Sequence, residues 1–177
     1  MTPAKPFWHI GESCLDRARH YSFTGSHNGG AAPASPPAAS LLAGAGALAT
    51  DAIMWTYVAI AIGGALGCWA RYAQTNLAQA VFGREFPFAT MSINVIGSFL
   101  MGFLFIATVE RLMIPPFVRA GVLTGALGGY TTFSTFEMET LLLAESGELL
   151  RAALYMGLSV SLGFMAAFGG AYLARNL

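Results

Sequence analysis

Apolar residues in this chain gather into long stretches that contain very few charges. A helix needs about 20 predominantly apolar residues to cross the hydrocarbon core of a bilayer. Windows of that kind run from about Met54 to Arg71, Phe88 to Val109, Phe117 to Ala144 and Leu149 to Leu173. Short polar or proline-bearing segments join them. The pattern therefore predicts an all-α membrane protein with four transmembrane helices in a compact bundle of alternating direction.

The first 53 residues differ from the rest. The stretch HNGGAAPASPPAASLLAGAGALAT (27–50) is rich in Ala, Gly, Pro and Ser and has neither helical nor strand periodicity. A segment of this composition cannot bury enough surface to order itself. We expect residues 1–53 to form a disordered extension, with Met54 as the true start, and residues 54–177 to form the transmembrane domain.

Composition and charge support a membrane protein. The chain is 55% apolar and 10% charged, whereas charged residues make up about 25% of ordinary soluble domains. The formal net charge is zero, so no basic surface indicates a nucleic-acid partner. All histidines lie in the first thirty residues. Because the spans contain none, no Ser, His and acid set can be assembled there, and an enzyme is not expected.

Arginines near the helix ends bear on orientation, because positive residues favour the cytoplasmic side. From Met54 onward they divide evenly between the two sides: Arg111, Arg119 and Arg175 on the side of Met54, and Arg71, Arg84 and Arg151 on the other. Balanced loops give no preferred orientation. Two opposed copies can then pair, so we expect an antiparallel, dual-topology homodimer.

Small residues recur at helical spacing on two spans. Gly121, Gly125 and Gly129 line one face of the third, and Gly63 and Gly67 repeat the pattern on the first. Membrane helices associate through close packing, which small residues permit. These faces are expected to pack within the chain or against a second copy.

The third span is expected to break near Gly128 and Gly129. Tyr130 and the β-branched Thr131 and Thr132 follow the two glycines, and together they form its weakest helical stretch. Unwound backbone at membrane depth must be buried in protein or line a wet cavity. A bound cation is one natural partner for its freed carbonyls.

Uncharged polar and aromatic residues follow this break. Thr132, Thr135 and Phe136 share a face, Phe133 lies at helical spacing from Phe136, and Asn94 is the only amide of the second span. Hydroxyl and amide donors without fixed positive charge suit a small anion that is held briefly and released. Phenylalanine edges are electropositive and add weak ligands. The two rings alone are equally consistent with ordinary core packing.

Three charged residues qualify this interpretation. Glu137 and Glu139 are candidates for function as carboxylates near membrane depth, although a carboxylate facing an anion path would repel anions. Arg71 either attracts anions into a vestibule or extends to the interface. Nearby, Cys68 is expected to be a small buried thiol.

Three segments of the chain resemble the motifs of the Fluc/CrcB fluoride channels: GGALGCWARY (63–72), ATMSINVIGSFLMGF (89–103) and GALGGYTTFSTF (125–136). Their order, spacing and four-span layout match from Met54 to Leu177. The resemblance implies an antiparallel homodimer in the inner (plasma) membrane that exports fluoride from the cytoplasm down its gradient. Glu137 is a departure, since relatives often have a small residue there.

The resemblance also implies roles for particular residues. Phe133 and Phe136 match aromatic ligands of the fluoride pore, and Arg71 matches a vestibule arginine. Gly128 and Thr131 match residues whose main-chain carbonyls hold a structural Na⁺ at the dimer centre. The remaining matches to polar pore residues are Asn94, Thr132, Ser134, Thr135, Tyr155 and Ser159, and Glu139 matches an acid after the aromatic pair.

Two other functions remain open. A small four-helix multidrug exporter would need a carboxylate embedded in the first span, and residues 54–71 contain none. A structural membrane subunit whose polar stripe grips a partner helix would conduct no ions.

Overall fold

The computed structural model describes residues 38–112 and 114–177. Across these residues the regular structure is entirely helical, and they contain no strand. The long helices are α2 (Ala38–Phe82), α3 (Phe88–Ile106) and α7 (Leu149–Asn176). The shorter elements are the π-helical η2 (Ala107–Arg111) and η3 (Gly121–Leu127), and the α-helices α4 (Pro116–Ala120), α5 (Gly128–Tyr130) and α6 (Phe133–Glu145).

Helix α2 is longer than the sequence pattern predicts at both ends. It begins at Ala38, so it includes residues 38–53, which the sequence pattern assigns to the disordered extension, while residues 1–37 lie outside the described part. Alanine has the highest intrinsic helix propensity, and AASLLAGAGALAT is rich in it. At the other end α2 continues past Arg71 to Phe82, and Gly83 follows it with a φ of 77°. Arg71 therefore lies within the helix instead of at its end.

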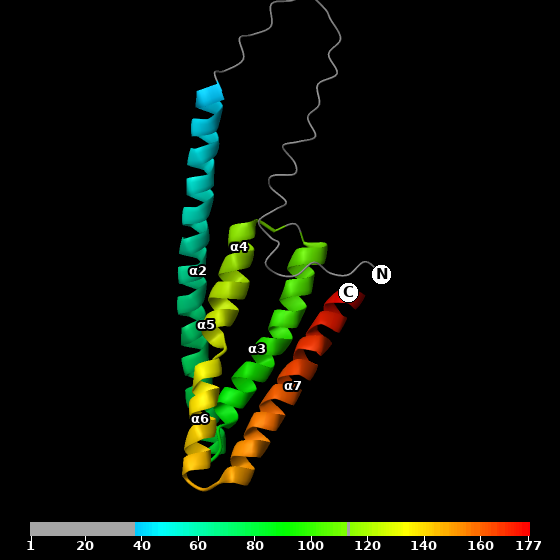
Figure 1. Ribbon diagram of the computed structural model, residues 1–177. Helices are drawn as coiled ribbons and strands as arrows, with labels where there is room; N and C mark the ends of the chain where they lie inside the picture. The colour runs from blue at the N-terminus through cyan, green and yellow to red at the C-terminus, as the bar shows by residue number, and fades with distance from the viewer. Residues whose placement is uncertain (1–37, 113) are drawn as a thin grey trace, which may run out of the picture. The chain divides into compact units, whose positions relative to one another are not determined.

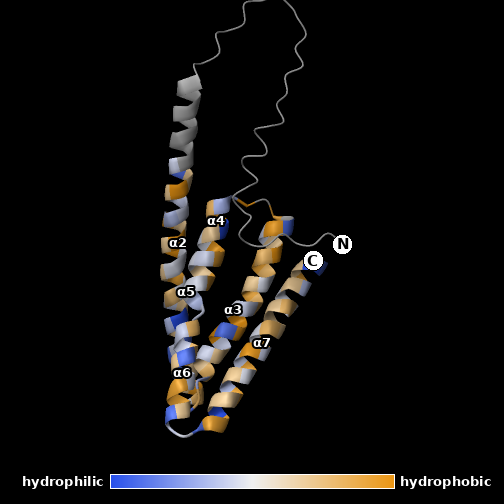
Figure 2. Ribbon diagram, viewed as in Figure 1, coloured by the Kyte–Doolittle hydropathy of each residue, from blue (hydrophilic) through white to orange (hydrophobic). Residues whose placement is uncertain are grey.

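Within residues 38–112 and 114–177, three helical stretches are long and apolar enough to cross a membrane, judged by length and composition: Thr50–Phe82, Phe88–Glu110 and Leu149–Asn176. Large apolar side chains remain exposed along them, including Trp55, Ile62 and Trp69 on α2 and Phe164 and Phe168 on α7. Figure 2 shows the apolar colouring along α3 and α7. The remaining window, the third in chain order (Phe117 to Ala144), is divided among α4, η3, α5 and α6.

The helices lie in two neighbouring groups, α2 beside α4, η3 and α5, and α3 beside α7 (Figure 1). Glycines allow the first group to pack closely, because a methyl group at Gly63 would lie 2.1 Å from Gly121 O and one at Gly67 would lie 2.0 Å from Ala126 O. The predicted glycine faces therefore meet each other within one chain. In the second group, Gly170 plays the same part against α3, since its methyl group would lie 2.1 Å from Phe99 O.

Candidate functional site

Helical geometry is interrupted between α5 and α6. Thr131 has φ −79° and ψ 158°, and Thr132 has φ −150° and ψ 113°, so both residues are extended. Gly128, by contrast, is helical, with φ −64° and ψ −38°. The chain leaves the helix after the glycine pair, at the two β-branched residues, which favour extended backbone.

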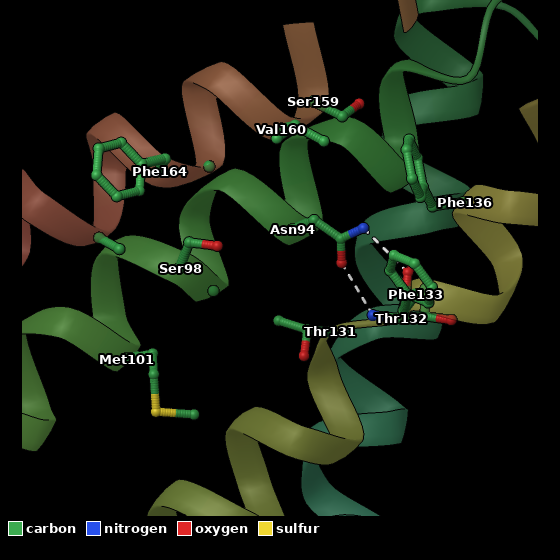
Figure 3. Close-up of a pocket in the computed structure, with 13 residues that line it drawn as sticks. Asn94, Ser98, Met101, Thr131, Thr132, Phe133, Phe136, Ser159, Val160 and Phe164 are labelled. Atoms are coloured by element: carbon green, nitrogen blue, oxygen red, sulfur yellow. Dashed lines mark hydrogen bonds between the residues drawn. The ribbon is translucent and has the colours of Figure 1, made fainter. Parts of the chain in front are cut away.

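Asn94 on α3 holds the extended residue Thr132 through two hydrogen bonds. The Thr132 N–H donates to Asn94 Oδ1 at 2.9 Å, and Asn94 Nδ2 donates to the Thr132 carbonyl at 3.0 Å (Figure 3). The pairing supplies the bonds that Thr132 would otherwise find in a helix, and such bonds must come from protein in a bilayer. An amide has two N–H donors, so one N–H of Asn94 is not used in this pairing.

Thr132 also begins helix α6. Its Oγ1 accepts from the Thr135 N–H at 3.3 Å and donates to Thr135 Oγ1 at 2.9 Å. This is the usual action of a threonine N-cap, which satisfies an amide of the first helical turn. Since the Thr135 hydroxyl is the acceptor in that contact, its own proton is not used in it.

Two cavities meet at Thr132. The first, of about 410 Å³, lies between α3, α6 and α7 (Figure 3), and its lining includes Asn94, Ser98, Thr131, Phe133, Phe136 and Ser159. The second, of about 500 Å³, is lined by Cys68, Arg71, Thr75, Thr90, Thr135 and Glu139 among others. Thr132 lines both. The cavity that holds the arginine and the cavity that holds the aromatic pair therefore share a wall residue, and both have uncharged donors in their lining.

The two phenylalanines have different surroundings. Phe136 is 5% exposed and Phe133 is 73% exposed, and their ring centroids are 5.8 Å apart with planes inclined at 46°. Phe136 also packs on Tyr155, at 5.2 Å and 57°. These tilted arrangements direct ring edges toward neighbouring groups.

Ser159 lines the first cavity and is 8% exposed. Its hydroxyl oxygen is buried and has no hydrogen-bond partner in the described part of the protein. An unpaired buried hydroxyl is unfavourable, and in this conformation the oxygen is covered by protein and not open to the cavity.

Glu139 is held by two hydroxyl groups. Thr90 Oγ1 donates to its Oε1 at 2.8 Å, and the Tyr155 hydroxyl donates to its Oε2 at 2.7 Å. Tyr155 is fully buried. The carboxylate is therefore hydrogen-bonded on both oxygens. Glu137 is exposed on α6.

The structure brings most of the predicted residues together, with some exceptions. Ser134 and Gly128 are exposed and line neither of the two cavities, and Tyr155 packs on Phe136 but also lines neither cavity. The expectation of a buried Cys68 is wrong: it is exposed and accepts a hydrogen bond from Arg71 Nη2 at 3.3 Å. Sequence reasoning missed Thr90, although its position four residues before Asn94 places both on one face of α3.

Residues 58–171 match the family model described as "CrcB-like protein, Camphor Resistance (CrcB)". A protein of Acidithiobacillus ferrooxidans is 56% identical over 121 residues, covering 68% of this chain and 97% of its own. A protein of Methylococcus capsulatus is 53% identical over 119 residues, which cover 67% of this chain and 52% of that protein. A protein of Magnetococcus marinus is 47% identical over 116 residues, which cover 66% of this chain and 94% of that protein.

All three relatives carry the curated name "Fluoride-specific ion channel FluC". The family match covers the whole region that holds Arg71, Asn94, the extended pair and Ser159. This chain belongs to the CrcB-like family.

Proposed function

We propose that this protein is a multi-pass protein of the bacterial plasma membrane that conducts fluoride out of the cytoplasm down its electrochemical gradient. The observation that carries the proposal is the line of uncharged donors, with Phe136 beside it, through the two cavities that meet at Thr132. Homologues named as fluoride-specific ion channels support the same function. Passive conduction involves no chemical step, so the protein is not an enzyme.

Fluoride is small and strongly hydrated, so a conducting path must replace its water with many donors at close quarters. Arg71 in the second cavity raises the local concentration of anions. Beyond it the Thr135 hydroxyl and the remaining Asn94 N–H can replace water in turn. Ring edges of Phe133 and Phe136 add contacts that carry no charge and therefore do not trap the ion.

Glu139 would oppose an anion if its carboxylate faced the path with no partner. Thr90 and Tyr155 each donate a hydroxyl hydrogen to it, and hydrogen bonds to a carboxylate are stabilising. We assign Glu139 the role of a fixed acceptor that orients these two hydroxyls beside the second cavity.

The finer architecture is also part of the proposal. In it, α4, η3, α5 and α6 together form the third of four spans, which is broken, and a second copy in the opposite orientation completes each path. The balanced arginines favour opposed copies. Phe133 is 73% exposed although it lines the first cavity, so a second copy would cover a side that one chain leaves open.

A structural Na⁺ held by the main-chain carbonyls of Gly128 and Thr131 fits the backbone geometry. In a continuous helix each carbonyl accepts from the N–H four residues later. Here the Thr132 N–H donates to Asn94 and the Thr135 N–H donates to Thr132 Oγ1. Both carbonyls are thus deprived of their helical donors, and an added methyl group at Gly128 would meet no atom within 4 Å. The ion would neutralise these two carbonyl dipoles.

Efflux from liposomes tests the function directly. Vesicles loaded with fluoride and containing the purified full chain should release it quickly, whereas chloride-loaded vesicles should keep their anion. Retained fluoride would reject the channel and favour a non-conducting structural subunit. Release of a cationic drug against its gradient would instead favour a small multidrug exporter.

A further inference from the structure

A second set of polar contacts reaches the interrupted region through side chains other than Asn94. The Tyr130 hydroxyl, at the end of α5, donates to Gln74 Oε1 on α2. Gln74 Nε2 donates to Ser92 Oγ on α3 at 3.1 Å, and Ser92 Oγ donates to the Ala89 carbonyl at 2.9 Å. These bonds form a relay with a single direction, from Tyr130 through Gln74 and Ser92 to the first turn of α3.

Every acceptor in the relay is matched to a donor. Ser92 accepts from Gln74 and donates to backbone, and the Gln74 amide uses its oxygen toward Tyr130 and its nitrogen toward Ser92. All three side chains are half-buried. Polar groups between membrane helices need protein partners, because lipid offers none. The relay therefore ties α2, α3 and α5 together at one level of the bundle.

The backbone around Tyr130 is confined by two glycines on those same helices. A methyl group at Gly67 on α2 would lie 2.8 Å from Tyr130 N. One at Gly97 on α3 would lie 2.2 Å from Thr131 Cγ2 and 3.3 Å from Tyr130 Cδ1. The close approach leaves little freedom to the ring, so the position of the hydroxyl is coupled to that of the backbone that follows it.

Tyr130 and Thr132 thus flank Thr131 and are each attached to α3 by different side chains, Tyr130 through Gln74 and Ser92, and Thr132 through Asn94. Thr131 itself is held on the side of α5, because its N–H and its hydroxyl both donate to the Leu127 carbonyl, at 3.0 and 2.9 Å. The Asn94 pairing fixes one end of the extended pair, and the Tyr130 contacts fix the residue that precedes its other end.

We propose that Tyr130 is a positioning residue of the conduction path, acting through Gln74 and Ser92 to hold Thr131 and Thr132 in the geometry that conducts. The inference rests on the proposed fluoride channel. It adds a role for three side chains that line neither of the two cavities, those of Tyr130, Gln74 and Ser92. Tyr130 itself touches no ion. It increases the fraction of time that Thr131 and Thr132 spend in the conducting geometry.

The variant Tyr130→Phe keeps the ring and removes only the hydroxyl. Gln74 Oε1 then loses its donor, and an unsatisfied buried acceptor of this kind shifts a local equilibrium by about tenfold. Tyr57→Phe is the matched control, because it deletes the same hydroxyl from α2 at a side chain that is 70% exposed. Gln74→Leu, alone and with Tyr130→Phe, tests whether the two residues act together.

Fluoride efflux from liposomes at low protein density gives two readouts. The fraction of trapped fluoride that is released reports how many channels are folded and active, and the rate of release reports turnover by each. We expect Tyr130→Phe to lower the rate about tenfold at an unchanged fraction, and Tyr57→Phe to change neither. The double variant should be no slower than the slower single variant.

Amide hydrogen exchange of the purified full chain tests the same inference without conduction. The Thr131 N–H donates to Leu127 O at 3.0 Å and the Thr132 N–H donates to Asn94 Oδ1 at 2.9 Å. Tyr130→Phe should raise exchange at these amides about tenfold and leave α7 unchanged.

The outcomes separate this inference from the proposed function. If liposomes containing the unsubstituted protein retain fluoride, the channel is rejected. Amide hydrogen exchange alone then decides whether Tyr130 holds the extended pair. If the original chain conducts and Tyr130→Phe has the same rate and the same exchange, the positioning role is rejected and the channel stands. A loss confined to the active fraction would also reject positioning, because it would show that the hydroxyl serves folding.

Discussion

Asn94→Asp tests the proposed path most directly, because it changes one nitrogen to oxygen and adds one negative charge. The Oδ1 atom that accepts from the Thr132 N–H at 2.9 Å is retained. The other atom now faces the Thr132 carbonyl, 3.0 Å away, as an acceptor opposite an acceptor. The variant therefore loses one hydrogen bond and places an anion beside the first cavity.

The two effects differ in size. Leaving a buried carbonyl without its donor is unfavourable by about 1–3 kcal/mol. A unit charge about 4 Å from a passing anion adds about 4 kcal/mol at an effective dielectric constant near 20. An increase of that size in a barrier slows passage roughly a thousandfold. The charge should therefore dominate, and conduction should stop on the scale of an efflux experiment.

Liposome efflux of fluoride measures the effect, and two further variants divide it. Asn94→Ala removes both hydrogen bonds without adding charge and should slow efflux about tenfold. Asn76→Asp makes the same chemical change at an exposed position on α2 and should leave the rate unchanged. If Asn94→Asp conducts as well as Asn94→Ala, no anion passes near this residue and the proposed path is wrong.

Three further predictions concern the aromatic pair, the glycine contacts and the ion. Phe136→Ile should lower fluoride efflux about tenfold through loss of the ring edge, while Phe168→Ile on the exposed face of α7 should not; equal rates would remove Phe136 from the path. Gly67→Ala would bring a methyl group to 2.0 Å from Ala126 O and should destabilise the fold by about 1–3 kcal/mol in thermal unfolding in detergent. Gly157→Ala, which meets no atom within 4 Å, is its control, and equal melting temperatures would contradict the packing. Replacing Na⁺ by a large organic cation should slow efflux and returning it should restore the rate; an indifferent rate would exclude the sodium site.

The sequence predicts the parts of this fold that depend on local composition. The starts of α3 at Phe88 and of α7 at Leu149 agree with the apolar windows, because a span is defined by a run of neighbouring residues. The predicted end of the first span at Arg71 is wrong. The segment TNLAQAVF is polar enough to suggest a loop, but it continues the helix to Phe82. A helix ends where the chain can turn away and the last carbonyls find other partners. Here Gly83, with its positive φ, provides that turn.

Contacts between distant residues are the part that the sequence could not predict. The sequence identifies Asn94 as an amide in an apolar span. Its pairing with Thr132, 38 residues later in the chain, follows only from the packed structure. The relay from Tyr130 to Gln74 is equally remote in sequence. Hydroxyl and amide side chains are common, and only the three-dimensional arrangement distinguishes a paired group from the unpartnered Ser159.

The position of the interruption shows why composition alone places it imprecisely. Glycine is a weak helix former, so the sequence favours a break at the adjacent Gly128 and Gly129. Yet Gly129 is needed for packing, since a methyl group there would lie 2.6 Å from Gly64 O, and the helical path brings it to that contact. The chain departs from the helix at Thr131 and Thr132 instead, where Asn94 supplies the bonds that the helix gives up. The interruption therefore lies where replacement hydrogen bonds are available, which makes Asn94 as important to its location as the glycines are.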